Sequence, residues 1–201
     1  MGRLVVVALA LVPALARADQ AEWRIGAGGG VTVIDARAGG VGGTGVGYAA
    51  RGRLAYGLSN IVELGLVGGY AHASDLEFDS TMLKNQTETL YADVSTFSFG
   101  TEVRWTPGVG LARAFERTGP YVAARAGGAL VMRTSQQLFT EGGLLIVAPS
   151  ADLHFAPFAG AGLGVERRFG DHLFLAAELA AWFCVDAREF GLTAEAAWAW
   201  Y

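Results

Sequence analysis

The sequence predicts an all-β protein, an eight-stranded antiparallel up-and-down transmembrane β-barrel with a polar, charge-filled lumen. Three observations support this prediction. The last stretch, 189–201, alternates with a period of two between an apolar face and a more polar face. The chain is 52% apolar with a mean hydropathy of +0.34, yet no apolar run of helix-spanning length follows residue 18. Charged residues on the expected strands share the face opposite the apolar one.

The first 18 residues have the three parts of a secretory signal peptide. A short basic start is followed by the apolar residues 4–15, and Ala16-Arg17-Ala18 matches the small-x-small cleavage pattern. The apolar run is shorter than the ~20 residues that a spanning helix needs. We therefore predict a signal peptide at 1–18 and one mature barrel domain, 19–201, with neither a retained anchor nor a lipid-bearing cysteine.

Eight stretches alternate between apolar and polar positions, and each is long enough to cross the ~25 Å apolar band of an outer-membrane-type barrel when tilted. The 29 glycines fit many short strands better than helices. The strands are expected at residues 22–33, 44–56, 61–72, 87–106, 120–133, 152–168, 173–185 and 189–201.

In the first half of the chain the alternation is clear. The first strand sends Trp23 outward and Arg24 inward. Gly57-Leu58-Ser59-Asn60 is expected to be a tight turn, because Gly and Asn tolerate positive φ and Ser and Asn bond the local backbone. Asp93 breaks the apolar face of the fourth strand unless it lies above the membrane.

The second half leaves alternatives open. Residues 144–147 either extend a strand or pack over the barrel mouth, and 173–185 also fits an alanine-rich helix. Pro157 is awkward within the sixth strand, because proline belongs at edges, bulges or strand beginnings. Residues 170–172 are expected to form a short turn before the seventh strand.

The lengths of the connections indicate an orientation. Outer-membrane barrels have long loops outside and short turns in the periplasm. With a periplasmic start, the turns near 57–60 and 170–172 point inward, whereas 107–119 and the short final outer link near Asp186 break the pattern. The loops expected outside are 35–43, 73–86 and 134–150.

The inward phase collects arginines and glutamates in equal number. An unpaired charge inside a narrow barrel would be costly, whereas paired, hydrogen-bonded charges can fill it. An eight-stranded barrel is just wide enough for side chains to fill, so we predict a lumen plugged by arginine-carboxylate pairs. The predicted lumenal charge ladder is Arg24, Arg51, Arg53, Glu63, Glu102, Arg104, Arg125, Glu166, Glu178 and Glu195.

The mature chain resembles the small outer-membrane β-barrel proteins of the OmpA/OmpX type, the outer membrane protein β-barrel domain group. The resemblance rests on the signal peptide, the strand alternation, the lumenal charges and the terminal Trp198-Ala199-Trp200-Tyr201. It implies a place in the bacterial outer membrane, in contact with lipid and lipopolysaccharide. It also implies that Trp198, Trp200 and Tyr201 form the signal read by the barrel-assembly machinery, although Trp200 fits the apolar phase better than Tyr201.

A hydrolase is one alternative function. His72 and Ser74 share the outward phase, and they resemble the lipid-facing serine and histidine of lipid A deacylases. A nucleophile needs a base within hydrogen-bond reach and an acid that orients the base, and Glu77 or Glu88 is the candidate acid. The two-residue match is weak, so an ordinary strand-end histidine is the favoured interpretation.

The remaining candidates favour no bound group. Asp75, Glu77 and Asp79 alternate in the second loop, as oxygen ligands of a calcium ion would, but no full coordination loop is present and a solvated acidic loop is favoured. The single cysteine, Cys184, is expected to be a small wall residue. The net charge of -4 favours no nucleic-acid partner.

The expected function is a structural, envelope-integrity or adhesive role through exposed loops, without catalysis, cofactor or metal. The protein is expected to be a monomer. The main rival is a narrow channel for ions or small solutes, which would need a water path past the charges. A soluble lipocalin-like barrel is a further alternative, and it would place the apolar residues inside and the arginines outside.

Overall fold

The alternating stretches form strands that pair with their sequence neighbours. The computed structural model describes residues 22–38, 41–59, 61–80, 88–106, 118–141, 144–185 and 187–200. The predicted signal peptide at 1–18, Tyr201, residues 107–117 and the end of the predicted 73–86 loop lie outside these ranges. The strands are β1 (Trp23–Ala38), β2 (Val41–Ser59), β3 (Val62–Ser80), β4 (Glu88–Trp105), β5 (Thr118–Glu141), β6 (Leu144–Phe169), β7 (Leu173–Cys184) and β8 (Ala187–Trp200).

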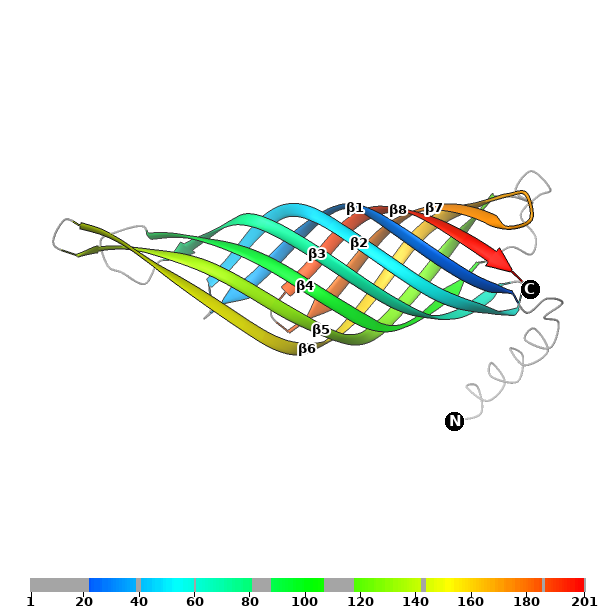
Figure 1. The fold of residues 1–201 in the computed structure, drawn as a ribbon, viewed down its shortest axis with the longest axis horizontal. Helices are drawn as coiled ribbons and strands as arrows, with labels where there is room; N and C mark the ends of the chain where they lie inside the picture. The colour runs from blue at the N-terminus through cyan, green and yellow to red at the C-terminus, as the bar shows by residue number, and fades with distance from the viewer. Residues whose placement is uncertain are drawn as a thin grey trace, which may run out of the picture.

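These strands form one closed antiparallel barrel in sequence order, with β8 paired to β1 (Figure 1). The predicted fold class is therefore confirmed. Residues 173–184 are a strand, so the helical alternative for this stretch is wrong. Within the described ranges, no helix is long and apolar enough to cross a membrane.

The barrel has two distinct ends. Trp23 at the start of β1 lies opposite Trp200 at the end of β8, and these residues define the termini end. At the other end β5 and β6 project beyond the remaining strands as a long hairpin (Figure 1), which defines the hairpin end.

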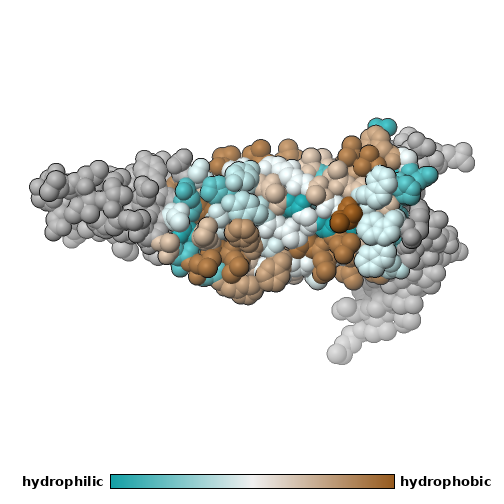
Figure 2. All heavy atoms as spheres, in the orientation of Figure 1, coloured by the Kyte–Doolittle hydropathy of each residue, from teal (hydrophilic) through white to brown (hydrophobic). Residues whose placement is uncertain are grey.

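The outward face is apolar over most of the barrel, as Figure 2 shows for one side. Leu64 and Leu175 are 46% and 43% exposed, while Arg53 and Glu102 on the opposite face are buried. A soluble barrel would have the reverse arrangement, because water favours polar side chains outside. The lipocalin-like alternative is therefore wrong.

Several predicted loops are in fact strand. β1 continues to Ala38 and β2 begins at Val41, so the predicted loop 35–43 is wrong. The predicted loop 134–150 is also wrong, because β5 reaches Glu141 and β6 begins at Leu144. β3 runs to Ser80, so residues 73–80 of the predicted loop 73–86 are strand as well. Antiparallel backbone hydrogen bonds continue through these segments, and such bonds do not require the alternation of apolar and polar side chains from which the strands were predicted. Residues 144–147 therefore extend a strand.

Two short connections at the termini end have local causes. β2 continues through Ser59, so residues 57–59 are strand rather than the predicted turn, and Gly57 does not have a positive φ. The Ser59 hydroxyl accepts hydrogen bonds from the backbone N–H groups of Ile61 and Val62, at 3.3 and 3.1 Å, and so fixes the turn between β2 and β3. Gly170, between β6 and β7, has a φ of 65°, a conformation that glycine adopts without strain.

Pro157 fits its strand because, in the part of the chain that the structure describes, no strand pairs with β6 at this position on the β7 side. The β6–β7 ladder ends where Phe158 lies opposite Cys184. Pro157 is the next residue beyond that end, so it occupies an edge position, where proline is tolerated.

Candidate functional site

A network of ion pairs crosses the barrel interior, and Arg53 of β2 lies at its centre. The three guanidinium nitrogens of Arg53 contact Glu63 at 2.8 Å, Glu102 at 2.9 Å and Glu195 at 2.8 Å. The three carboxylates come from β3, β4 and β8, because inward positions of every strand converge on the axis of a narrow barrel. A single arginine thereby joins four strands.

Arg125 of β5 is the second centre. Its guanidinium donates to Glu102 at 2.6 Å and to both carboxylate oxygens of Glu178, each at 2.6 Å. The Tyr121 hydroxyl donates to Glu178 at 3.0 Å. The two-point contact with Glu178 is the strong, directional form of an arginine-carboxylate pair.

Arg104 of β4 links the network toward the termini end. It contacts Glu102 at 3.5 Å, Glu166 at 3.2 Å and Glu195 at 3.3 Å, and its guanidinium lies 4.1 Å from the centre of the Tyr121 ring. Arg104 is 1% exposed, so its charge depends on these partners rather than on water.

The two remaining arginines of the predicted ladder lie toward the two ends of the network. Arg24 contacts Glu63 at 2.5 Å and Glu166 at 3.0 Å near the termini end. Arg51 contacts Glu189 at 2.8 Å and Glu178 at 3.6 Å on the other side.

Glycines make room for these long side chains. A Cβ atom on Gly162 would lie 2.7 Å from the Glu178 carboxyl carbon and 3.0 Å from an Arg125 nitrogen. A Cβ on Gly164 would lie 2.3 Å from the Tyr121 ring. The distances of 2.7 and 2.3 Å are too short for nonbonded atoms, so the charged layer needs bare backbone at these β6 positions.

The structure places all ten residues of the predicted ladder in this interior, and each contacts another member of the ten. Among the described residues, sequence reasoning missed Glu22, Arg168 and Glu189 as further members. Glu22 contacts Arg24 at 3.7 Å and Arg168 at 3.6 Å. The inward parity of Glu22 with Arg24, and of Glu189 with Glu195, was the available signal.

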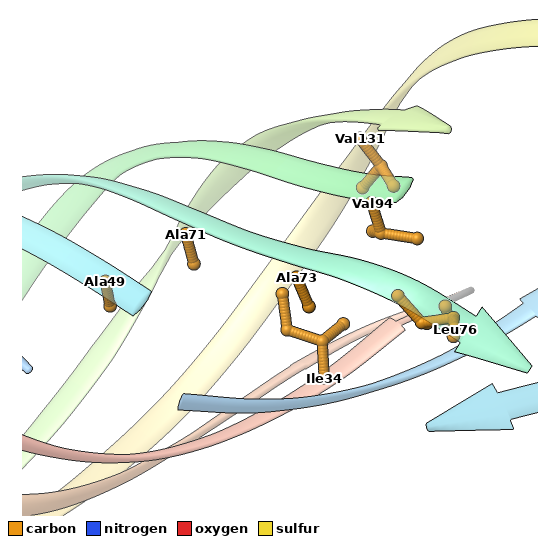
Figure 3. Packing of buried hydrophobic residues seen from close by; sticks show 8 residues of the cluster. Ile34, Ala49, Ala71, Ala73, Leu76, Val94 and Val131 are labelled. Atoms are coloured by element: carbon orange, nitrogen blue, oxygen red, sulfur yellow. The ribbon is translucent and has the colours of Figure 1, made fainter. Parts of the chain in front are cut away.

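The predicted polar, charge-filled lumen is confirmed, and the structure adds an apolar layer toward the hairpin end. In this layer the inward residues pack as a dry core (Figure 3), and six of them have no exposed surface. The apolar layer consists of Ile34, Ala36, Ala49, Ala71, Ala73, Leu76, Val94 and Val131. The lumen is therefore filled by charges in one part and by apolar side chains in the next.

A polar cavity of about 200 Å³ lies in the part of the ion-pair network nearest the termini end. Glu22, Arg24, Glu63, Glu166 and Arg168 line it. Among the described residues, no group of three or more His, Cys, Asp or Glu side chains is arranged to hold a metal ion. The acidic stretch Asp75, Glu77 and Asp79 has no described side chains.

His72 has a different partner from the one considered in the hydrolase hypothesis. Its Nδ1 atom lies 2.9 Å from the hydroxyl oxygen of Ser95 on β4, in hydrogen-bond contact. Ser74 is exposed and is not the partner of His72. The side chains of the candidate acids Glu77 and Glu88 lie outside the described part of the structure.

The aromatic residues of the closing strand face outward. Trp198 and Trp200 are exposed, and the ring centre of Trp198 lies 5.2 Å from that of His172. Exposed aromatic side chains near the end of a barrel are typical of the boundary between membrane and water.

Comparisons with known proteins agree with this architecture. A family model described as "outer membrane protein beta-barrel domain" matches residues 4–182. A major outer membrane protein from Thermus thermophilus has a similar structure, with 15% identity, 90% of this chain and 100% of that chain covered, and a TM-score of 0.54.

Two further solved structures share the fold. OprG from Pseudomonas aeruginosa is 12% identical, with 92% of this chain and 98% of that chain covered and a TM-score of 0.52. Ail, the attachment invasion locus protein of Yersinia pestis, is 12% identical, with 90% and 99% covered and a TM-score of 0.51. No curated protein sequence matches this chain. The family match over most of the chain, together with the closed barrel, shows that this protein belongs to the outer membrane protein beta-barrel domain family.

Proposed function

We propose that this protein is a plugged, non-conducting barrel whose function is structural or adhesive and resides in the parts exposed outside the cell. In this proposal residues 1–18 are removed on export, and the mature chain acts as a monomer without catalytic site or cofactor. Outer-membrane lipid and lipopolysaccharide surround it, and the barrel-assembly machinery inserts it through the signal at Trp198, Trp200 and Tyr201.

The connections support an orientation with the termini end in the periplasm. The turns near 59–62 and 170–172 are short and lie at that end, whereas the β5–β6 hairpin projects from the other end. Short periplasmic turns and long outer extensions are the usual arrangement of these barrels. The hairpin end therefore faces outward.

The observation that carries the proposal is that the lumen is closed in two different ways. The arginine-glutamate network fills one level, and the apolar layer around Ile34 and Leu76 fills the next. A conducting path needs water, and an apolar constriction excludes water even where it is not sterically sealed. Removal of charges alone would leave this second barrier in place.

The projecting sheet supplies a surface for adhesion. β7 ends opposite Phe158, so within the described residues no strand pairs with residues 144–157 of β6 on that side. On the other side, the β4–β5 ladder ends at Gln136. Fourteen residues at a rise of about 3.3 Å give an edge of roughly 45 Å. Unpaired strand edges accept an extended segment of a partner through backbone hydrogen bonds.

Single-channel recording tests the plug against the rival channel function. The mature chain is refolded into planar bilayers and compared with Arg51→Ala/Arg53→Ala, with Leu76→Ser/Val94→Ser, and with all four substitutions together. We expect no conductance from the parent and openings chiefly from the fourfold variant, because both barriers must be breached. Steady, ion-selective conductance of the parent would overturn the proposal and make the charges a selectivity device.

Cell attachment tests the adhesive role. Cells that produce the parent or a variant without residues 137–148 are compared on surfaces coated with fibronectin or laminin. We expect attachment to fall when the hairpin is shortened, while the amount of folded barrel in the membrane stays the same. Equal attachment of both cell lines above the empty control would place adhesion elsewhere, and no attachment of either would leave only the structural role.

A further inference from the structure

Polar side chains gather at one place on the lipid-facing surface, on the neighbouring strands β2, β3 and β4. Tyr48, Tyr70, His72 and Ser95 form this outward cluster. Polar groups that face lipid are costly unless they are hydrogen-bonded. Their convergence therefore needs a physical explanation.

The cluster is held together by contacts around Ser95. The hydroxyl oxygen of Ser95 lies 2.9 Å from His72 Nδ1 and 3.4 Å from the Tyr70 hydroxyl. The ring of Tyr48 is centred 5.5 Å from that of His72 and 6.0 Å from that of Tyr70. Ser95 is buried beneath its neighbours, whereas Tyr48 is 54% exposed. Ser95 thus orients the cluster, and Tyr48 and His72 present it.

The cluster lies where the apolar band ends. Toward the termini end, the outward residues of β3 and β4 include Leu66 and Phe99, which are exposed and apolar. Toward the hairpin end they include Ser74 and Asp93, which are exposed and polar. Tyrosine is enriched at this boundary because its ring suits lipid and its hydroxyl suits the headgroup layer.

Two irregularities of the sheet flank the cluster. The β2–β3 register shifts between Thr44 and Gly47, beside Tyr48. The β3–β4 register shifts between Ala73 and Leu76, beside His72. Such bulges re-aim neighbouring side chains and are frequent next to functional sites. Two of them beside one cluster indicate that the local surface is shaped, rather than a regular part of the aromatic girdle.

The chemistry of the cluster favours a neutral sugar over a phosphate. No lysine or arginine occurs in residues 44–50, 66–74 or 93–97, so these segments themselves offer no cation to a phosphate. Asp93, the next outward residue after Ser95 on β4, is exposed and adds an acidic rather than a basic side chain to this part of the surface. Aromatic rings offer flat apolar faces against which the C–H face of a sugar ring can pack.

We propose that the outward cluster binds the uncharged sugar headgroup of a glycolipid in the outer leaflet. Tyr48 and His72 contact the sugar, Asp93 and Ser74 lie within the headgroup layer beside it, and Ser95 is a positioning residue. The site goes beyond the structural or adhesive role and needs only that the barrel is inserted with its hairpin end outward.

The test measures the thermal unfolding of the refolded mature chain in vesicles of three compositions. The vesicles contain phosphatidylcholine alone, phosphatidylcholine with digalactosyl diglyceride, or phosphatidylcholine with phosphatidic acid. The electrophoretic mobility of the folded barrel is followed against temperature. We expect digalactosyl diglyceride to raise the Tm by about 2 to 4 °C, as a ligand that binds only the folded state does, and phosphatidic acid to leave it unchanged.

Variants assign the effect to the cluster. His72→Phe and Tyr48→Leu should abolish the rise, whereas Phe99→Leu, which removes an exposed aromatic residue from the middle of the band, should retain it. Ser95→Ala should weaken it. The inference is overturned by the absence of any sugar-dependent rise in the parent, by an equal rise with phosphatidic acid, or by a rise that both cluster variants retain. A chain that fails to fold in any vesicle would instead contradict the membrane-barrel function itself.

Discussion

The coupling between Arg125 and Glu178 gives a quantitative test of the charge network. Arg125→Leu removes the contacts to Glu102 and to both oxygens of Glu178, all at 2.6 Å. Removing one partner of a buried ion pair costs about 3 to 5 kcal/mol, because the other charge stays buried. Glu102 keeps Arg53 at 2.9 Å, but the nearest remaining arginine to Glu178 is Arg51 at 3.6 Å. We therefore expect about 3 kcal/mol, near the lower limit.

Removing both partners should lower the free energy of unfolding by less than the value of about 3 kcal/mol expected for Arg125→Leu alone. In Arg125→Leu/Glu178→Leu no carboxylate is left without its main partner, so we expect about 1 to 2 kcal/mol of the loss to be recovered. The assay is urea unfolding of the refolded mature chain in micelles, followed by tryptophan fluorescence. The outward-facing Arg167→Leu is the control and should change the free energy of unfolding by no more than about 0.5 kcal/mol.

Two results would refute the reasoning. A loss below about 1 kcal/mol for Arg125→Leu would mean that water or rearranged side chains replace the pair. The second result is a loss of unfolding free energy in the double variant that equals the sum of the losses in Arg125→Leu and Glu178→Leu. It would mean that Arg125 and Glu178 are not coupled.

Three further predictions concern the wall of the barrel. Gly164→Ala should lower the free energy of unfolding or prevent folding, because its Cβ would lie 2.3 Å from the Tyr121 ring; Gly52→Ala, where the nearest atom is 3.9 Å away, is the matched control and should be tolerated. Leu163→Arg, on the lipid-facing surface, should cost about 2 to 4 kcal/mol in urea unfolding in vesicles if it lies near the bilayer midplane, and a cost near zero would contradict the placement of this face. Trp200→Ala should slow insertion by the purified assembly machinery more than it slows unassisted refolding into detergent, and equal slowing would assign Trp200 to barrel closure alone.

Much of the fold could be predicted because strand alternation is a local property. A period of two determines which face each residue occupies without knowledge of its neighbours. Arg104, Arg125, Glu102 and Glu178 could therefore be assigned inward from their parity alone, before any contact was known. The strand ends were less predictable, because the backbone hydrogen bonds between β5 and β6 continue without requiring alternation.

The pairing of His72 shows where local reasoning ends. Spacing along β3 suggested Ser74, two residues away on the same face. The structure instead brings Ser95 of β4 to 2.9 Å from the imidazole. The register of β3 against β4, including the shift between Ala73 and Leu76, decides this contact. Register depends on the whole hairpin and its bulges, which one strand does not encode.

The sequence by itself determined the fold class, the outward and inward faces and the set of charges that enter the lumen, because each follows from alternation along single strands. Only the tertiary structure decided which carboxylate meets which arginine, since Arg104 of β4 and Glu195 of β8 are 91 residues apart and meet across the closed barrel. It also decided that Ile34 and Leu76, from different strands, pack into one apolar layer. Closure of the sheet brings inward positions of distant strands within contact, and this geometry exists only once all eight strands have paired.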